Sequence, residues 1–323
     1  MWYNESPIIT DNRNFRERIP ATNAYFDAAK EEMLALPMEE GVITKENLVM
    51  FVDCPVCGSL NHRHLFVKWG IEYKECMLCT HIFARNQFRP EVLSNFYHNS
   101  QTDKLDRVVQ TSSVHRDYWG QVYKKYLRIL LATNQYRSLL DVGCGAGEFL
   151  SFCKTNCGLD LYACELAEDT YDNLRQLIGE DNLFFGNTME QTDFKGKRFD
   201  IITFWGVIEH IANPHLIFRK FPEMLSDNGC ILILIPNLHS HAFRILGVET
   251  PTLTPRAHIN FFTPKSMREL CKKHKIAIEW QVQELPVIDL MYPHVSYSEK
   301  LVDEIVRNNE CYYHVYCLKK EAI

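Results

Sequence analysis

Residues 138–150 read SLLDVGCGAGEFL, and this stretch decides the fold of the chain. Its first five residues are mostly apolar and are expected to end a buried strand. Three glycines at alternate positions follow, and the last three residues begin a helical pattern. Glycine permits tight backbone angles and close approach of a ligand, and a helix N-terminus presents unpaired N–H groups. The stretch therefore predicts a nucleotide-binding turn between a strand and a helix.

The spacing of the glycines limits which class of ligand the turn can bind. A dinucleotide fingerprint is G-x-G-x-x-G, whereas the third glycine here comes one position early and Glu148 stands where it should be. Both Glu148 and the preceding Asp141 would repel a phosphate, but Asp141 can accept a hydrogen bond from a ligand ammonium. The pattern favours a ligand with an amino-acid end and no phosphates. A glycine-rich turn without any ligand stays open as the alternative.

From this turn onward, predicted strands and helices alternate, which indicates a doubly wound parallel sheet. One acidic residue, Glu165, ends the second strand about 20 residues past the first glycine, where such residues bind ribose hydroxyls. The alternation pauses at 238–263, a long predicted loop rich in His, Pro and Thr. Strands are expected at 138–142, 159–164, 182–185, 199–205, 230–235, 276–282 and 312–318, and helices at 21–36, 118–132, 170–178, 214–225, 264–274 and 296–308.

Two cysteine pairs precede this region. Cys54 and Cys57 form one C-x-x-C pair and Cys76 and Cys79 form a second, with eighteen residues between the two pairs. This spacing matches a zinc ribbon, in which four thiolates on two tight turns converge on one ion. Because the protein would fill all four positions, the zinc is expected to be structural. His62, His64 and His81 are alternative ligands, but they are expected to be surface histidines.

Composition sets further limits. The chain has 323 residues, twelve cysteines and a formal net charge of −6. No signal peptide and no long apolar stretch are visible, so we expect a cytoplasmic protein with reduced thiols and no membrane partner. The acidic balance argues against a dedicated nucleic-acid binder. We expect an N-terminal extension at 1–46, the zinc module at 47–90, and one large domain with linker helices at its start at 91–323.

The sequence from about 115 to 323 resembles the class I S-adenosylmethionine-dependent methyltransferases, whose motif I matches the D-x-G-x-G-x-G pattern. The segment 258–263, HINFFT, resembles one seen in the ubiquinone-type O-methyltransferase branch. The double C-x-x-C ahead of such a domain is similar to methyltransferases acting on nucleotide-linked or polysaccharide sugars. The resemblance implies a Rossmann-like seven-stranded sheet and S-adenosylmethionine as the donor. It places donor contacts at Asp141, Gly143, Cys144, Gly145, Gly147, Glu165, Leu166, Asn187, Thr188, Trp205 and Gly206.

Methyl transfer from a sulfonium needs alignment of the acceptor, and a hydroxyl acceptor benefits from a nearby base. His210 and His258 are the candidates because both follow strand ends, where ligands bind in such sheets. Glu209 is a third candidate, and each histidine could instead be structural. Arg256 is expected to orient a phosphate or carboxylate on the acceptor.

These observations predict an O-methyltransferase acting on a small-molecule hydroxyl, such as that of a sugar or sugar nucleotide. Two alternatives remain. The chain could be an RNA methyltransferase that grips RNA with its zinc module, or a non-catalytic subunit that binds S-adenosylmethionine.

Overall fold

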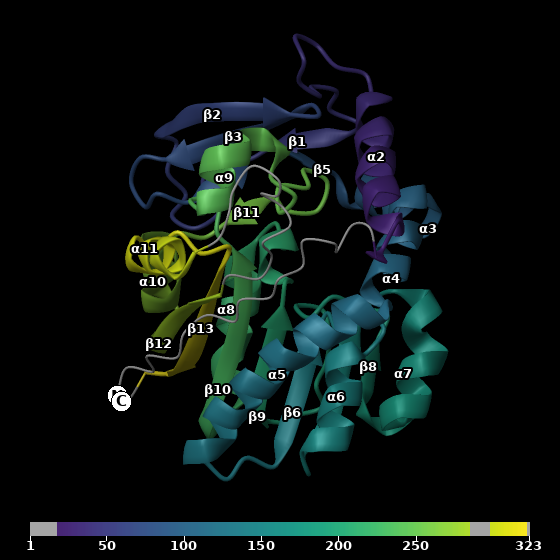
Figure 1. Ribbon diagram of the computed structural model, residues 1–323, viewed down its shortest axis with the longest axis vertical. Coiled ribbons are helices and arrows are strands. Elements are labelled where there is room, and N and C mark those ends of the chain that lie inside the picture. Colours follow the sequence, from purple (N-terminus) through teal and green to yellow (C-terminus); the bar gives the residue numbers. More distant parts are fainter. Residues whose placement is uncertain (1–17, 285–297, 322–323) are drawn as a thin grey trace.

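The computed structural model describes residues 18–284 and 298–321. Figure 1 shows a large sheet flanked by helices, with a smaller body of short strands stacked above one end of it. The carboxyl ends of the parallel strands lie at the edge of the large sheet that faces the smaller body. The glycine turn lies at the same edge, because it follows one of these strands. This arrangement brings the two regions that the motifs singled out into contact.

The large sheet has seven strands in the order β12-β13-β10-β9-β6-β7-β8. The five strands from β10 to β8 are mutually parallel, whereas β13 runs antiparallel to both of its neighbours. The chain starts at the centre with β6, moves outward to β8 and returns to β9 on the other side of β6. Ligands bind at such a switch point, outside the carboxyl ends of the strands. The strands are β6 (Ser138–Val142), β7 (Asp160–Glu165), β8 (Leu183–Phe185), β9 (Phe199–Trp205), β10 (Leu225–Pro236), β12 (Ile276–Glu284) and β13 (Tyr313–Lys320).

Side chains of each strand point alternately to the two faces of the sheet, and helices bury both faces. Leu139 and Ile201 belong to one apolar cluster, with the helices α5, α6 and α7. Their neighbours Leu140 and Ile202 belong to the opposite cluster, with α8 and α10. The helices are α5 (Ser113–Thr133), α6 (Glu148–Asn156), α7 (Tyr171–Ile178), α8 (Pro214–Met224), α10 (Pro264–Lys273) and, near the end, α11 (Glu299–Arg307).

The smaller body contains a four-stranded sheet in the order β11-β4-β3-β2 and a two-stranded sheet of β1 and β5. Its edge strand β11 (Asn260–Phe261) comes from the segment that follows β10, far along the chain from the others. The apolar core beneath it joins Met33 and Ile43 to Tyr73 and to Leu253. The other strands are β1 (Val49–Phe51), β2 (His62–Lys68), β3 (Ile71–Cys76), β4 (Ile82–Ala84) and β5 (Asn86–Phe88).

Three helices connect the two bodies: α2 (Ala21–Leu34), α3 (Pro90–Asn99) and α4 (Gln101–Gln110). The start of α4 is set by Ser100, whose hydroxyl accepts a hydrogen bond from the Asp103 N–H at 3.1 Å. Such caps pair donors that the first turn of a helix leaves free. Among the helices that the structure describes, none is long and apolar enough to cross a bilayer.

The predicted elements are present, with shifts of a few residues at their ends. The strand β10 begins at Leu225, inside the predicted helix end, and crosses an irregularity before regular pairing resumes at Cys230. The long predicted loop contains α9 (His241–Leu246), η4 (Gly247–Glu249) and β11. The predicted helix start at Ser296 lies outside the described residues, and α11 begins at Glu299.

Candidate active site

The glycine turn between β6 and α6 has all three glycines in the left-handed region, with φ values of +65°, +52° and +82° at Gly143, Gly145 and Gly147. A Cβ at Gly143 would lie 2.8 Å from Val207 Cγ2, and one at Gly147 would lie 2.9 Å from Leu174 Cδ2. A side chain at either position would be strained by the positive φ and would also displace these neighbours.

Gly145 differs from its neighbours because its surroundings are open. A Cβ there would meet only the Gln110 Oε1, at 3.8 Å. This space lies beside the N-terminus of α6, whose N-cap is Gly147. The turn is therefore not closed by packing at Gly145, where the nearest group is the side chain of the last residue of α4.

Glu165 spans the edge between β6 and β7. Its Oε2 accepts a hydrogen bond from the Gly145 N–H at 2.7 Å, and its Oε1 accepts from the N–H groups of Leu166 at 2.7 Å and Ala167 at 3.0 Å. These bonds hold the carboxylate at the carboxyl edge of the sheet. In a phosphate-binding turn the Gly145 amide would be free for the ligand, whereas here a carboxylate already occupies it.

Asp141 is buried beneath the turn, at 2% exposure. Its Oδ1 accepts a hydrogen bond from the Thr203 hydroxyl at 2.6 Å. Burial raises the pKa of Asp141 to about 8, with the nearby Glu165 carboxylate adding to the rise. A ligand cation beside it would stabilise the ionised form.

The other predicted donor contacts lie along the same edge. Cys144 is half-buried in the turn, Leu166 is 49% exposed directly after β7, and Asn187 and Thr188 follow β8. At the end of β9, Trp205 has a buried Nε1 without a hydrogen-bond partner among the described residues. The next residue, Gly206, has a φ of +70°. These positions remain predictions as donor contacts.

Linker helices and a helix at 118–132 were predicted, but the contacts that α4 and the start of α5 make with this edge were not. Arg107 of α4 forms an ion pair with Asp169, which follows β7. His115, in the first turn of α5, has its Nδ1 3.4 Å from Oε2 of Glu148 in the first turn of α6. The signal available in the sequence was the Ser100 cap, which marks a separate helix ahead of the glycine turn.

The three predicted catalytic residues come together. Glu209 and His210 lie in η3 (Ile208–His210), after β9, and the ring centroids of His210 and His258 are 4.9 Å apart. One ligand atom from each of the three side chains lies within 4.8 Å of the others, so the cluster could also hold a metal ion. The Oε2 of Glu209 is buried and has no hydrogen-bond partner in the described part of the chain.

Burial sets the protonation of this cluster. It raises the pKa of Glu209 to about 8 and lowers that of His210 to about 3 and that of His258 to about 4. At neutral pH both imidazoles are therefore neutral and the carboxyl group carries its proton. The Nδ1 of His258 is hydrogen-bonded to the Thr252 carbonyl. Because a carbonyl only accepts, Nδ1 carries the proton and Nε2 keeps a free lone pair.

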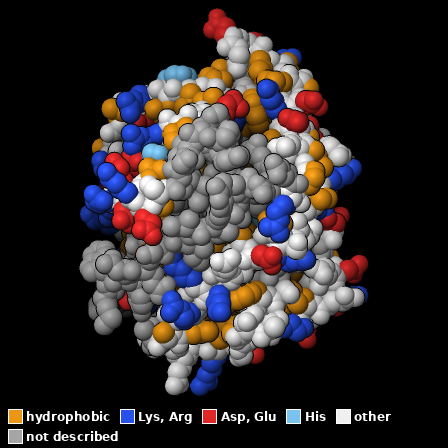
Figure 2. Space-filling view, in the orientation of Figure 1, with side chains coloured by type: hydrophobic (Ala, Val, Ile, Leu, Met, Phe, Trp, Pro, Cys, Tyr) orange, Lys and Arg blue, Asp and Glu red, His pale blue; other side chains and the backbone are white. Residues whose placement is uncertain are grey.

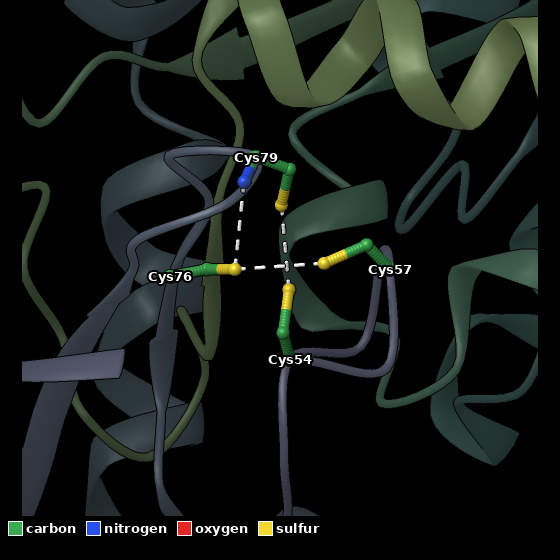
Figure 3. A group of neighbouring side chains, drawn as sticks. All are labelled: Cys54, Cys57, Cys76 and Cys79. Carbon is green, nitrogen blue, oxygen red and sulfur yellow. Dashed lines mark hydrogen bonds between the residues drawn. The ribbon is translucent and has the colours of Figure 1, made fainter. Parts of the chain in front are cut away.

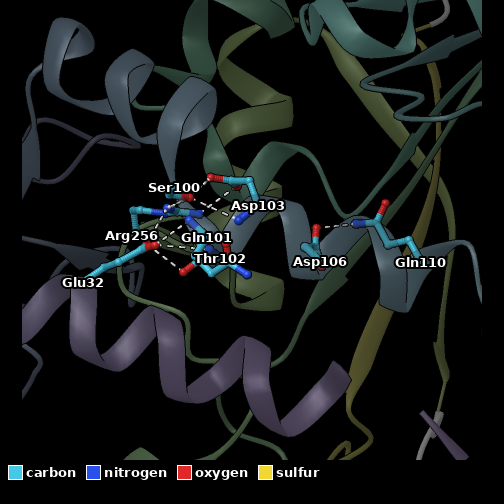
Figure 4. A network of polar contacts seen from close by, with 8 residues as sticks. All are labelled: Glu32, Ser100, Gln101, Thr102, Asp103, Asp106, Gln110 and Arg256. Carbon is cyan, nitrogen blue, oxygen red and sulfur yellow. Dashed lines mark hydrogen bonds and ion pairs between the residues drawn. The ribbon is translucent and has the colours of Figure 1, made fainter. Parts of the chain in front are cut away.

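Arg256 does not play the role expected of it. Figure 4 shows its guanidinium enclosed by side chains from α2 and from the start of α4. It donates to Asp103 at 2.8 Å, to the Ser100 hydroxyl at 2.9 Å and to Glu32 at 3.3 Å. Its side chain is 10% exposed. Arg256 therefore joins the loop after β10 to α2 and α4, and the expectation that it orients an acceptor anion is wrong because internal carboxylates hold it.

The four cysteines of the smaller body converge (Figure 3). The Sγ atoms of Cys54 and Cys79 are 3.5 Å apart, as are those of Cys57 and Cys76, and all four lie within 4.8 Å of one another. Four thiolates bound tetrahedrally to zinc would be about 3.8 Å apart. The two turns match: the N–H of Gly58 donates to the Cys54 carbonyl and the N–H of Thr80 to the Cys76 carbonyl.

The chemistry of the cluster also suits a cation. The Cys79 thiol next to Cys54 lowers the pKa of Cys54 to about 4, whereas burial raises that of Cys57 to about 11. Without a cation, packing the four thiols together keeps some of them protonated. A bound zinc ion would favour the thiolate at each position.

The histidines of this body differ from expectation in two cases. The side chain of His62 is only 10% exposed, with its Nε2 3.5 Å from Oδ1 of Asp53. His64 is exposed on β2, as predicted, with its Nδ1 2.9 Å from Oε1 of Glu72. His81 is fully buried, and its Nε2 is 2.8 Å from Oδ1 of Asn260. The expectation of a surface residue fails for His81 because β11, contributed from far along the chain, covers it.

A family model described as a methyltransferase domain matches residues 115–277, about half of the chain. The chain belongs to this methyltransferase family. The matched residues include the glycine turn, Glu165, η3 and His258, so the edge described above lies within the methyltransferase domain. The cysteine cluster lies outside the matched range.

Curated relatives with similar sequences are named O-methyltransferases. The chain is 31% identical over 115 residues to the ubiquinone biosynthesis O-methyltransferase of Parvibaculum lavamentivorans, covering 34% of this chain and 45% of that protein. It is 30% identical over 138 residues to the enzyme of the same name from Glaesserella parasuis, covering 39% and 57%. The chain thus spans about half the length of the curated relatives it matches.

Two solved structures are also similar to this methyltransferase chain. A plantazolicin methyltransferase in complex with SAH has a TM-score of 0.47 and 15% identity, covering 71% of this chain and 94% of that one. A possible histamine N-methyltransferase from Thermotoga maritima has a TM-score of 0.47 and 17% identity, covering 71% and 99%.

Proposed function

We propose that this chain is an S-adenosylmethionine-dependent methyltransferase that methylates a hydroxyl group of a small molecule. The observation that carries the donor assignment is the hydrogen bond from the Gly145 N–H to the Glu165 carboxylate. The carboxylate occupies the Gly145 amide that a pyrophosphate would need, and it keeps an acceptor position for a ribose hydroxyl. The names of the curated relatives, which are O-methyltransferases, support the same reaction class.

The base in this proposal is His258. Its Nε2 lone pair is free because Nδ1–H is bonded to the Thr252 carbonyl. The bound donor supplies an activated methyl group, so the protein needs only to align the acceptor and take its proton. Glu209, protonated at neutral pH, can donate a hydrogen bond to the acceptor and so help to orient it.

The acceptor in this proposal is a sugar or sugar nucleotide. Trp119 of α5 and Tyr313 of β13 are partly exposed, and their ring centroids are 6.1 Å apart. Burial raises the pKa of the Tyr313 hydroxyl, with a smaller contribution from the Glu209 carboxylate when it is ionised. Flat apolar faces beside polar groups suit a ring that carries hydroxyls.

The RNA alternative has less support. Phosphate recognition requires clustered Lys and Arg. The formal net charge is −6, and Figure 2 shows side chains of both signs spread over the visible face. A steep loss of RNA binding with added salt would favour this alternative, and a chain that binds the donor but methylates no acceptor would favour a non-catalytic subunit.

Calorimetry with S-adenosylmethionine and with NAD tests the donor assignment. We expect binding of the former only, and binding of NAD alone would overturn the proposal. A screen of sugar nucleotides, free sugars and RNA with methyl-labelled donor tests the acceptor. The proposal also includes one structural zinc ion on Cys54, Cys57, Cys76 and Cys79, and a cytoplasmic location.

A further inference from the structure

The cysteine module contacts the segment that carries His258 through backbone pairing. Strand β4 of the module pairs antiparallel with β11, with Phe83 opposite Asn260. The Ala84 N–H donates to the Ile259 carbonyl at 2.9 Å. One residue earlier, the Tyr73 hydroxyl donates to the carbonyl of His258 itself at 2.8 Å. The module therefore holds the backbone carbonyls of both His258 and Ile259.

A second connection runs through the side chain of Asn260, which is fully buried. Its Oδ1 is 2.8 Å from Nε2 of His81, and its Nδ2 donates to the carbonyl of Ile211 at 2.7 Å. His81 lies two residues after Cys79, and Ile211 directly follows His210. Asn260 thus links the second cysteine turn to the turn that bears Glu209 and His210.

The same segment is bonded to that turn directly. The Ile259 N–H donates to the backbone carbonyl of Glu209 at 3.0 Å. His258 and His210 are therefore held at their separation by two bonds, one from Ile259 and one from Asn260. The Asn260 bond depends on His81, because the His81 ring holds the other end of the amide and so sets its orientation.

We propose that the cysteine module is a positioning element for methyl transfer, in which His81 and Asn260 hold His258 against the Glu209–His210 turn. This inference rests on the proposed function and assigns the module a role in it. His81 and Asn260 are positioning residues, because they act through His258 and not on the acceptor. A misplacement of about 1 Å in a reacting group can lower turnover by about 100-fold.

The test compares two variants of His81 with a matched control in the same interface. His81→Phe keeps the ring, which packs against Phe83 and Phe262 at centroid distances of 6.2 and 4.7 Å, but removes the bond to Asn260. His81→Gln keeps an N–H donor. The control is Lys265→Met, which removes a bond between Lys265 Nζ and the Leu78 carbonyl but touches neither Asn260 nor His258.

Using the zinc-containing protein as purified, we expect His81→Phe to lower kcat by about 10- to 100-fold while donor Kd changes by less than about twofold. His81→Gln should recover most of kcat, and Lys265→Met should match the wild type. If His81→Phe keeps full kcat, or if Lys265→Met loses as much, the module does not position the site.

A second measurement keeps this test separate from the proposed function. The nitrogen NMR signals of His258 report its tautomer and hydrogen bonding even when no acceptor is known. We expect them to shift in His81→Phe and in Asn260→Ala but not in Lys265→Met. Unchanged His258 signals in both variants would overturn the positioning role. A wild-type protein that methylates no acceptor, with shifted signals in the variants, would overturn only the proposed function.

Discussion

The carboxylate of Glu165 accepts a hydrogen bond from the backbone N–H of Gly145, with 2.7 Å between Oε2 and the nitrogen. This bond joins the end of β7 to the middle glycine of the turn after β6. It places a negative charge where the ribose of the donor is proposed to lie, and it removes the amide that a phosphate would need.

Glu165→Gln should therefore weaken donor binding. Loss of a charged acceptor costs about 1.5–3 kcal/mol, which corresponds to a roughly 10- to 100-fold rise in Kd for S-adenosylmethionine. Calorimetry measures this directly. Glu168→Gln, a change on the neighbouring exposed turn, is the control. If donor affinity stays within twofold of the wild type, Glu165 does not bind the ribose.

His258→Ala should lower turnover by about 100- to 10,000-fold, the range for loss of a general base, with donor affinity unchanged. Because burial lowers the pKa of His258 to about 4, the acid limb of the turnover profile should lie near pH 4, well below that of an ordinary histidine. Steady-state rates at each pH, with His64→Ala as an exposed control, test both points. If His258→Ala keeps full turnover across pH 6 to 9, His258 is not the general base and His210 is the next candidate. Replacement of His210 should affect donor binding as well as turnover.

Glu209→Gln should change how stability depends on pH. Burial raises the pKa of Glu209 from 4.5 to about 8. The folded state binds this proton more tightly, so the contribution to stability is fully present below about pH 4.5 and is lost as the pH rises through 8. The glutamine variant escapes that loss, so its Tm relative to the wild type should rise from pH 5 to pH 9. Glu223→Gln, on the exposed face of α8, is the control, and a constant difference would contradict the raised pKa.

Cys76→Ser should abolish tight zinc binding, which elemental analysis of purified protein measures. A structural zinc contributes roughly 10–16 kcal/mol to folding of a small module. The sequence alone suggests that unfolding would stop at residues 47–90. Because β11 pairs with β4, we expect hydrogen exchange to increase at 258–263 as well, with β6 and β7 unchanged. One zinc per chain in the variant, or full protection of 258–263, would contradict this.

Arg256→Met should destabilise the protein and leave acceptor binding unaffected. The change removes partly buried, charged hydrogen bonds to Glu32 and Asp103, which costs about 1.5–3 kcal/mol. Arg244→Met removes an exposed pair with Glu310 and should cost about 0–1 kcal/mol. Denaturant unfolding compares the two. A large rise in acceptor KM without loss of stability would contradict this prediction and indicate that Arg256 binds the acceptor.

Much of the site could be predicted from the sequence because the motifs that form it are short. The three glycines of the turn and each pair of cysteines are spaced within a few residues, and the acidic residue ends the next strand, about 20 residues past the first glycine. Backbone sterics and metal geometry impose that spacing directly, so the sheet and the cysteine cluster could be predicted from the sequence.

Other features depend on contacts between residues far apart in the chain, and only the tertiary structure decided them. His81 was expected at the surface, but β11 covers it. Arg256 was expected to bind the acceptor, but its guanidinium is bonded to Glu32 and Asp103. Gln110 gave no sign of lying opposite Gly145. The sequence determined which chemistry the chain carries, because each motif is short. The folded structure decided which groups meet and which remain charged, because burial and long-range pairing arise only when distant segments pack together.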